Sequence, residues 1–244
     1  MKKFLLICVT YHSDKELQVF MESVQRAQKR VNGIMQVDIE VADNGQDNRG
    51  YLGGALPIYT AKAQDYDYVS ISNVDLELAE DFFEQLLTVD TKNIGWIAPD
   101  IYTDKINRHE NPYMFARPTK RNFAIWDIIY SSTLIYRLYH RLYLLKNKKT
   151  KVFPRCQIYA GHGSFMLFTR SFVEQNPEIH FPTFMYGEEI WFAELTRSAQ
   201  LTVQYIPTLR IANIGNISTG LINQSQKSKW CKESLLAIYK QFFK

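Results

Sequence analysis

The stretch YVSISNVDLELAEDFFEQL, residues 68–86, joins a short apolar run to a group of polar and acidic side chains. Residues 68–72 are mostly apolar, which predicts a buried strand. Asp75 follows this strand, and apolar residues recur at helical spacing from Leu78 to Leu87. Taken alone, Asp75 is a helix N-cap or a turn residue. A carboxylate in this place can also hold a divalent cation, because hard cations prefer oxygen ligands.

The same alternation of strand and helix extends through the first hundred residues. The predicted strands are residues 4–10, 37–42, 68–72 and 94–98, and the predicted helices are residues 13–31, 55–64 and 78–87. Ser13 and Glu16 predict a capping box at the first helix. Strands that alternate with helices favour an α/β fold with a mostly parallel central sheet covered by helices.

Polar side chains stand at the carboxyl ends of three predicted strands. They are Thr10 with Tyr11, Asp43 with Asn44, and Asn73 with Asp75. In open α/β sheets, ligands bind outside these strand ends. The three groups therefore predict one binding edge, where Asn73 can offer a neutral hydrogen-bonding group to a ribose or to the substrate.

Asp43 has two interpretations. It can form an Asx turn, or it can accept a hydrogen bond from the ring N–H of a uracil or thymine base. Thr10 and Tyr11 would then lie one strand away, with the tyrosine ring packed on the base or the ribose. Gly53, in the glycine-rich stretch 50–54, allows close backbone approach. That stretch lacks the GxGxxG pattern of nicotinamide and flavin sites.

The second half of the chain is less regular. Residues 101–124 are polar and are expected to be rich in loops, whereas residues 125–150 are apolar and aromatic with interspersed Arg and Lys. The latter segment predicts a helical insertion. It either packs on the domain or lies at a membrane, with its Trp, Tyr, Ile and Leu in the headgroup boundary and its Arg and Lys against anionic lipid. Further strands are predicted at residues 164–168 and 201–206, and further helices at residues 188–198 and 226–244.

Composition limits the possible classes of function. The net charge of +4 over 244 residues is too mild for a nucleic-acid-binding protein. Three widely spaced cysteines, Cys8, Cys156 and Cys231, favour reduced thiols in the cytoplasm over a disulfide framework. The apolar stretch at residues 4–9 is shorter than the core of a signal peptide, and no apolar run predicts a membrane-spanning helix. We expect a cytoplasmic protein, at the inner face of the membrane if the insertion binds lipid.

The stretch FPTFMYGEEIWFAELTR, residues 181–197, places Glu188 and Glu189 after a glycine and at the start of a predicted helix. Acidic residues in a first turn suit the helix dipole. The same carboxylates can supply a general base that takes the proton from an acceptor hydroxyl. Phe184, Tyr186 and Trp191 can then pack against the faces of a sugar.

Six stretches, taken in their order and spacing, resemble the family 2 glycosyltransferases with the GT-A fold, especially the rhamnosyltransferase-like enzymes of bacterial polysaccharide synthesis. They are VTYHSDKEL, VADNGQDNRGYLGGA, YVSISNVDLEL, GHGSFMLFTRSF, FMYGEEIWFAEL and PTLRIANIGNIST. The resemblance covers about residues 4–219. It implies inverting transfer of a sugar from a nucleoside diphosphate, UDP or dTDP by expectation, to a saccharide or lipid-linked saccharide.

The resemblance also implies roles for parts of the chain. A single domain, residues 1–244, would hold the donor in residues 1–100 and the acceptor in residues 101–225. Asp75 matches the metal position of a DxD-type motif. In the acidic pair Glu188–Glu189, the second member matches the usual base.

Two residues depart from the family pattern. Asn73 replaces the first carboxylate of the DxD-type motif, and Asn213 stands where related sequences often carry a histidine that can complete the metal site. An amide oxygen is a weak ligand for Mn²⁺ but is acceptable for Mg²⁺. The expected cofactor is therefore Mg²⁺ or Mn²⁺, with Asp75 and Asn213 as its ligands.

Two other functions stay open. A sugar nucleotidyltransferase also uses a parallel sheet, but it usually has a glycine-rich basic loop where this chain has the acidic stretch 10–14. A catalytically weakened binding or scaffold protein is the second, and Asn213 favours it. His162, which precedes the predicted strand 164–168, is either a structural histidine or an acceptor-side residue.

Overall fold

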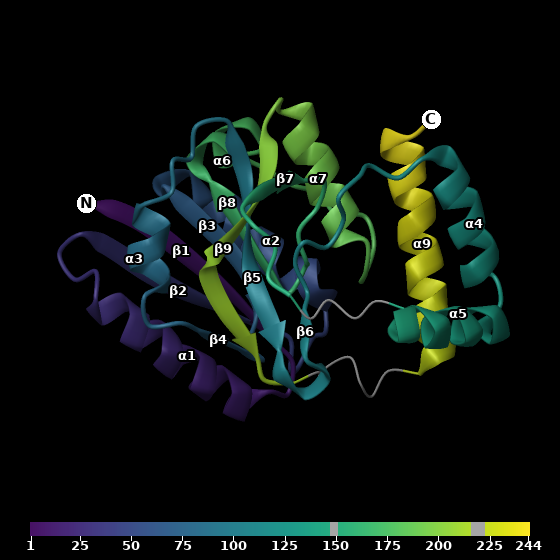
Figure 1. Cartoon of the computed structure of the whole chain (residues 1–244), viewed down its shortest axis with the longest axis horizontal. Coiled ribbons are helices and arrows are strands. Elements are labelled where there is room, and N and C mark those ends of the chain that lie inside the picture. The colour runs from purple at the N-terminus through teal and green to yellow at the C-terminus, as the bar shows by residue number, and fades with distance from the viewer. Residues whose placement is uncertain (147–150, 216–222) are drawn as a thin grey trace.

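The computed structural model describes residues 1–146, 151–215 and 223–244 (Figure 1). The strands are β1 (Lys2–Thr10), β2 (Met35–Asp43), β3 (Tyr68–Asn73), β4 (Leu76–Leu78), β5 (Ile94–Thr103), β6 (Arg108–His109), β7 (Cys156–Ile158), β8 (Phe165–Thr169) and β9 (Thr202–Asn213). The helices are α1 (Asp14–Lys29), α2 (Gly50–Lys62), α3 (Phe82–Leu87), α4 (Lys120–Tyr130), α5 (Thr133–Lys146), α6 (Arg170–Gln175), α7 (Glu188–Ser198) and α9 (Gln224–Phe242).

The strands form one mixed sheet in the order β2-β1-β3-β8-β5-β9-β4, with β6 paired to β5 and β7 to β9. Strands β1, β2, β3, β5 and β9 run in one direction, and β4 and β8 run in the other. The predicted α/β fold, with a mostly parallel sheet and a helical insertion, is therefore confirmed. One edge of the sheet collects the carboxyl ends of the five co-directional strands together with the amino ends of β4 and β8.

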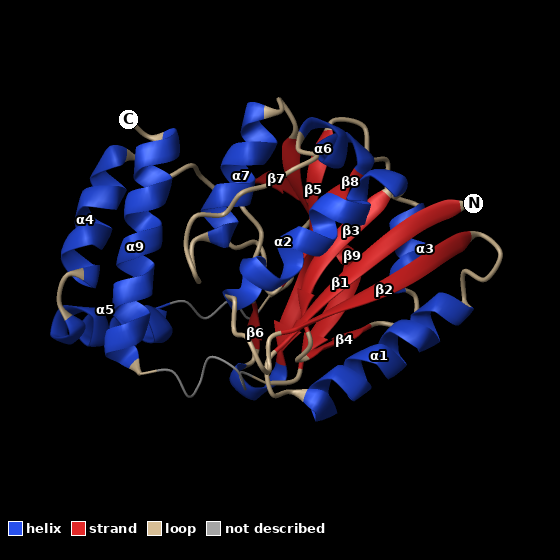
Figure 2. Cartoon of the chain, turned by 180° about the vertical axis from the view of Figure 1, so that it is seen from behind, coloured by secondary structure: helices blue, strands red, loops and turns tan. Residues whose placement is uncertain are grey.

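Helices cover both faces of the sheet (Figure 2). Side chains alternate along β1, so that Phe4, Leu6 and Cys8 pack with α1 and α3, whereas Leu5 and Ile7 pack with α2, α6 and α7. A strand that is buried on both faces reads as a continuous apolar run. This is why apolar runs predicted β1 and β3 correctly, whereas β2, at the edge of the sheet, is only partly buried and alternates apolar with polar residues.

Three helices form a smaller unit beside the sheet, made of α4, α5 and α9 (Figures 1 and 2). Its own apolar cluster contains Phe123 from α4 and Leu235 and Ile238 from α9, and Trp191 of α7 joins it. The helical insertion predicted at residues 125–150 corresponds to α4 and α5, except that residues 147–150 lie outside the described part of the chain.

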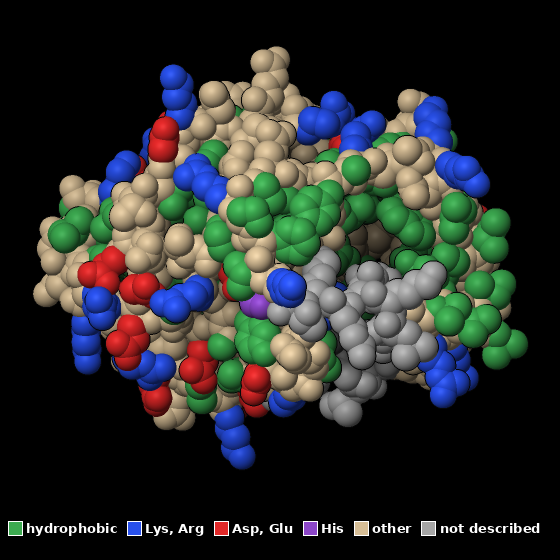
Figure 3. Space-filling model, in the orientation of Figure 1, with side chains coloured by type: hydrophobic (Ala, Val, Ile, Leu, Met, Phe, Trp, Pro, Cys, Tyr) green, Lys and Arg blue, Asp and Glu red, His purple; other side chains and the backbone are tan. Residues whose placement is uncertain are grey.

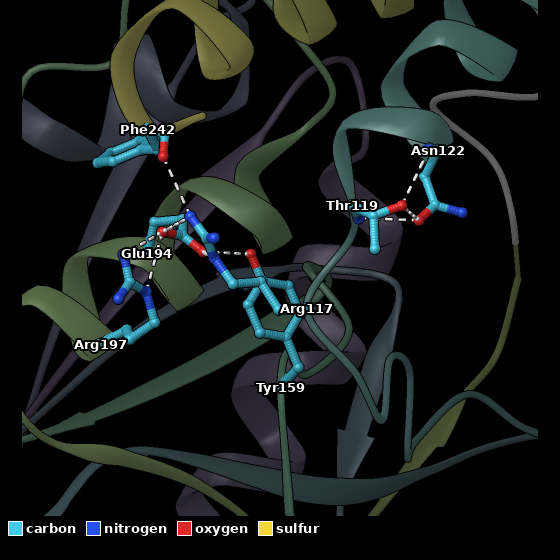
Figure 4. A network of polar contacts seen from close by, with 7 residues as sticks. All are labelled: Arg117, Thr119, Asn122, Tyr159, Glu194, Arg197 and Phe242. Atoms are coloured by element: carbon cyan, nitrogen blue, oxygen red, sulfur yellow. Dashed lines mark hydrogen bonds and ion pairs between the residues drawn. The ribbon is translucent and has the colours of Figure 1, made fainter. Parts of the chain in front are cut away.

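A buried carboxylate connects this unit to the sheet (Figure 4). The side chain of Glu194 on α7 is fully buried and accepts hydrogen bonds from Arg117, Tyr159 and Arg197. Arg117 also donates to the backbone carbonyl of Phe242, 3.0 Å away at the end of α9. A charge at this depth is tolerated because several charged and polar donors surround it.

Two local predictions were wrong. Ser13 does not form a capping box, since its hydroxyl donates to the backbone carbonyl of Tyr11 at 2.9 Å. Leu78 belongs to strand β4, which pairs with β9, and the helix starts only at Phe82. The segment 101–124 is rich in loops as expected, although β5 runs to Thr103 and the segment also contains β6 and the start of α4.

Candidate functional site

A cavity of about 540 Å³ lies at the edge of the sheet where the strand ends meet. Ten of the residues that the sequence singled out line it: Thr10, Tyr11, Asn44, Asn73, Asp75, His162, Tyr186, Glu188, Glu189 and Asn213. Residues from β1, β3, β9 and α7 thus converge on one space, although they are spread over most of the chain.

The pairing of β4 with β9 brings Asp75 and Asn213 together. Leu76 lies opposite Asn213 in the ladder, and the N–H of Ile214 donates to the backbone carbonyl of Asp75 at 3.0 Å. Both side chains are nearly buried, with exposed fractions of 8% for Asp75 and 7% for Asn213. The side-chain oxygen of Asn213 accepts a hydrogen bond from Gly215 at 3.1 Å, which fixes its orientation. Asp75 therefore precedes a strand, and it is not a helix N-cap.

The acidic pair is held at the first turn of α7 by an unusual backbone. Tyr186 and Gly187 both have positive φ, at 71° and 84°. This conformation is strained for a bulky residue, and such strain gathers at functional sites. A Cβ added to Gly163 would lie 2.9 Å from Cγ of Glu188 and 3.1 Å from Oε1 of Glu189. Both carboxylates are therefore packed against the backbone of Gly163.

The environment raises the pKa of both carboxyl groups. Burial raises the pKa of Glu188, and burial together with the neighbouring charge of Glu188 raises the pKa of Glu189 to about 8. The N–H of Gly163 hydrogen-bonds Glu189 and opposes this shift only in part. Two carboxylates that share a partly dry site cannot both ionise easily, so one of them holds its proton near neutral pH.

Other contacts fix the loop around Gly163, against which the acidic pair packs. The hydroxyl of Tyr51 donates to the backbone carbonyl of Gly163 at 2.9 Å. The N–H of Ser164 donates to Nδ1 of His162 at 3.2 Å, and the Ser164 hydroxyl lies 2.9 Å from the same nitrogen. Nδ1 is thus an acceptor, which leaves the ring proton of a neutral His162 on Nε2. Its role on the acceptor side stays a prediction.

Three buried polar atoms of this site have no hydrogen-bond partner among the described residues. They are the hydroxyl oxygen of Thr10, Oδ1 of Asn44 and the hydroxyl of Tyr186. The side chain of Asn44 is held by its nitrogen Nδ2, which donates to the backbone carbonyl of Gly50 at 2.9 Å. Unsatisfied buried polar groups are rare in folded proteins, and their concentration here is typical of a binding site.

Three predicted residues are placed elsewhere. Asp43 is exposed at the end of β2 and accepts a hydrogen bond from the N–H of Gly45 at 2.8 Å, which is the Asx turn. Gly53 lies inside α2, one turn beyond the cavity wall. Trp191 points away from the cavity, because its ring packs against Phe181 and Phe242 at centroid distances of 5.5 and 5.0 Å.

The sequence reading missed part of the wall. Tyr51, Tyr113 and Trp230 line the cavity without having been predicted, whereas Phe184, which also lines it, was predicted to pack against a sugar. The rings of Phe184 and Trp230 lie 4.8 Å apart. Trp230 could have been identified as a candidate from the sequence, since it is a single aromatic residue in the polar stretch SQKSKWCKES, residues 225–234.

The charge of the cavity favours a ligand that arrives with a cation. Three carboxylates line it, those of Asp75, Glu188 and Glu189, and the described lining contains no Lys or Arg. Among the described residues, no three His, Cys, Asp or Glu side chains form a group that could hold a metal by themselves. Mg²⁺ is commonly bound by one or two carboxylates together with substrate phosphates. Asp75 and Asn213 fit such a shared site.

The fold resembles known glycosyltransferase domains. The catalytic domain of Drosophila β1,4-galactosyltransferase 7 in complex with xylobiose aligns over 94% of this chain and 80% of its own, with 17% identity and a TM-score of 0.51. A mutant of that enzyme, in complex with manganese, UDP-Gal and xylobiose, aligns over the same shares with 16% identity and a TM-score of 0.52. This chain has the GT-A fold.

At these identities the likeness shows the fold alone. The sequence matches no protein-family model. It also matches no curated protein. The GT-A fold explains why the cavity lies at the carboxyl ends of the strands, where open α/β sheets bind their ligands.

Proposed function

We propose that this protein is an inverting glycosyltransferase. It transfers a sugar from a nucleoside diphosphate, UDP or dTDP, to a hydroxyl of a saccharide or a lipid-linked saccharide. One observation carries the proposal: in a GT-A fold, the acidic pair Glu188–Glu189 lines the same cavity as Asp75 and Asn213. The galactosyltransferase complex that contains manganese, UDP-Gal and xylobiose supports this class of donor and acceptor.

The reaction is a single displacement. Glu189 takes the proton from the acceptor hydroxyl while the hydroxyl oxygen forms a bond to the anomeric carbon and the bond from that carbon to the diphosphate oxygen breaks. A pKa raised towards neutrality suits a general base. Glu188 keeps the pKa of Glu189 high and orients the acceptor, and Gly163, which accepts a hydrogen bond from Tyr51, supports both carboxylates.

Asp75 and Asn213 would hold a Mg²⁺ or Mn²⁺ ion together with the diphosphate. Such an ion neutralises charge on the leaving diphosphate. Thr10, Tyr11, Asn44 and Asn73 line the donor side of the cavity, and Gly53 lies just outside it. Asp43, exposed at the end of β2, stays the proposed acceptor for the N–H of the base.

We further propose that the chain belongs with the family 2 glycosyltransferases and acts in the synthesis of a cell-surface polysaccharide. Residues 1–100 carry the donor side and residues 101–225 carry the acceptor side. A cytoplasmic location fits the three cysteines, which are free thiols.

A donor screen tests the proposal. Thermal unfolding is measured with UDP-, GDP- and dTDP-sugars, each with and without Mg²⁺ or Mn²⁺, and a ligand that binds only the folded state raises the midpoint. We expect a UDP- or dTDP-sugar to stabilise the protein, and the divalent ion to increase the effect. If no nucleotide sugar shifts the midpoint of a well-folded sample, the proposed function is wrong.

A further inference from the structure

Helix α5 exposes a row of aliphatic side chains. Leu134, Ile135, Leu138 and Leu142 have exposed fractions of 75%, 43%, 61% and 51%. Their spacing places them on one side of the helix. Here they are called the aliphatic face. Arg137 and Arg141 are exposed beside it.

Several aromatic side chains of the same unit pack inward, at least in part. On α4, the ring of Trp126 packs on Phe123 at 5.5 Å, and both belong to the buried cluster shared with α9. The half-buried rings of Tyr130 and Tyr136 lie 5.9 Å apart. Trp126, Tyr130 and Tyr136 are therefore half-buried within the unit, and the aliphatic side chains form its most exposed apolar surface. The exposed side of α4 carries Ile125 and Ile128, which are 45% and 62% exposed.

Apolar side chains are gathered along the side of the molecule formed by α4 and α5, with Lys and Arg at both ends of this patch (Figure 3). Water is a poor environment for so many neighbouring aliphatic groups, and large exposed apolar patches mark interaction sites. Phe115 and Phe153, on the segments that lead into and out of the two helices, are also exposed, with their rings 5.5 Å apart.

The charge of this part of the sequence is strongly one-sided. Residues 111–173 contain eleven Lys and Arg and a single acidic residue, Asp127. Asp127 is itself paired with Lys232 of α9 at 3.4 Å. The remainder of the chain holds 18 Lys and Arg against 24 Asp and Glu, so the net charge of +4 combines a basic stretch of sequence with an otherwise acidic chain. Within this stretch, Arg117 and Arg170 are paired with Glu194 and Glu174, whereas Arg137 and Arg141 are exposed.

We propose that the aliphatic face docks on an anionic lipid membrane. Aliphatic side chains enter the boundary between headgroups and acyl chains, while Arg137 and Arg141 meet lipid phosphates. A second copy of the chain fits this surface less well, because a two-fold contact would set one basic segment against another. The attachment is peripheral, and among the described residues no helix is long and apolar enough to cross a membrane.

The docked orientation links the membrane to the cavity. Helix α9 packs against α4 and α5 and supplies Trp230 to the cavity wall. The surface of the membrane is thus connected to the cavity by a single helix. That this delivers a lipid-linked acceptor rests on the proposed function, whereas the membrane contact itself does not.

Vesicle co-sedimentation of the full chain tests the docking. The parent should bind vesicles of phosphatidylcholine with phosphatidylglycerol and should not bind phosphatidylcholine alone, and added salt should weaken binding. Leu134→Asp with Leu138→Asp should reduce binding about tenfold or more, because it places charge on the inserted face. Arg137→Gln with Arg141→Gln should also reduce it about tenfold.

Similar substitutions of exposed residues away from α5 test whether any change of surface charge or polarity alters vesicle binding. Ile34→Asp replaces an aliphatic residue that is 57% exposed at the far end of α1. Lys29→Gln with Lys92→Gln removes the same charge as the arginine pair. Both controls should bind vesicles as the parent does. Equal binding to both kinds of vesicle, or equal losses in the controls, would overturn the proposal.

Two further measurements separate the possible failures. Light scattering reports the oligomeric state, and a dimer that Leu134→Asp with Leu138→Asp converts to a monomer would assign the face to a second copy instead. Calorimetry with UDP in the absence of lipid reports the donor site. Intact UDP binding without vesicle binding overturns only the docking, whereas vesicle binding without any nucleotide binding overturns only the proposed function.

Discussion

At the scale of single residues, the two carboxylates at the start of α7 differ in what they are expected to do. Both pack against Gly163, yet the raised pKa of Glu189 depends in part on the charge of Glu188. The base and the neighbour that raises its pKa can therefore be distinguished by substituting each one with a side chain of the same shape.

Glu189→Gln keeps the size of the side chain and removes the base. We expect the rate of sugar transfer to fall by about 10²- to 10⁴-fold, while UDP binding measured by calorimetry stays within about threefold of the parent. Glu188→Gln should be the milder change. Near-normal transfer by Glu189→Gln together with an inactive Glu188→Gln would exchange the two roles, and near-normal transfer by both would remove the pair from the mechanism.

The rate should also depend on pH with a definite sign. A general base acts when deprotonated, and the pKa of Glu189 is raised to about 8 by burial and by Glu188. Transfer under subsaturating substrate should therefore increase as pH rises from about 6 to 9. Glu188→Gln removes the neighbouring charge, so its profile should move to lower pH. A profile that is flat, or unmoved in Glu188→Gln, contradicts the coupling.

At the scale of secondary-structure elements, two contacts between separate segments of the chain shape the site. The β4–β9 ladder sets Asp75 beside Asn213, and the loop before β8 sets Gly163 against α7. Each contact joins segments far apart in the sequence, and each can be disturbed by one substitution.

Asp75→Ala should remove the part of UDP binding that depends on Mg²⁺ or Mn²⁺. Calorimetry of the parent should show tighter UDP binding with the ion than without it. In the variant, the ratio of the two affinities should be at least about tenfold smaller. The exposed Glu80, on the turn before α3, supplies the control Glu80→Ala, which should behave as the parent does. An unchanged ion effect in Asp75→Ala would place the cation elsewhere.

Gly163→Ala should misplace the acidic pair without unfolding the protein. The new Cβ would lie within about 3 Å of both carboxylate side chains, whose flexible ends can move away. A displacement of about 1 Å can cost about 10²-fold in rate. Gly53→Ala, inside α2 and outside the cavity, is the control. Full transfer activity in Gly163→Ala would show that the transfer rate does not depend on the present positions of the two carboxylates.

At the scale of the whole molecule, the network around Glu194 joins the helical unit to the sheet (Figure 4). Burial alone would raise the pKa of Glu194, but hydrogen bonds from Arg117, Tyr159 and Arg197 outweigh it and hold the pKa below its usual value. A depressed carboxyl pKa contributes stability above the pKa of the unfolded chain, and this contribution is lost as pH falls through the pKa of the folded state.

Arg117→Met removes the two-point ion pair and the contact of the guanidinium with the ring of Phe243 at 4.1 Å. We expect a loss of about 1–3 kcal/mol in the free energy of unfolding at pH 7. The loss should shrink in acid, where Glu194 is protonated in both proteins. Arg210→Met breaks an exposed pair with Asp81 and should change stability by less than about 1 kcal/mol. If both substitutions lowered the free energy of unfolding by the same amount, the buried network would contribute no more to stability than an exposed ion pair.

The sequence by itself predicted most elements of the fold and the edge that carries the site. Apolar runs located β1, β3, β5 and β8, the alternating stretch VDIEVA located β2, and Gly187 with the acidic pair located the start of α7. These predictions succeeded because strand and helix periodicity is a local property of the chain. The polar residues at strand ends could be grouped in advance, since co-directional strands end at the same edge.

The tertiary structure alone decided which of these residues meet. Nothing local places β8 between β3 and β5, turns Leu76–Leu78 into a strand against β9, or sets Asp75 beside Asn213. The sequence singled out Trp191 and not Trp230, but packing on Phe242 turns Trp191 away from the cavity while α9 carries Trp230 to its wall. The physical reason is that strand pairing and the direction of a side chain depend on burial between distant segments, which local periodicity does not encode.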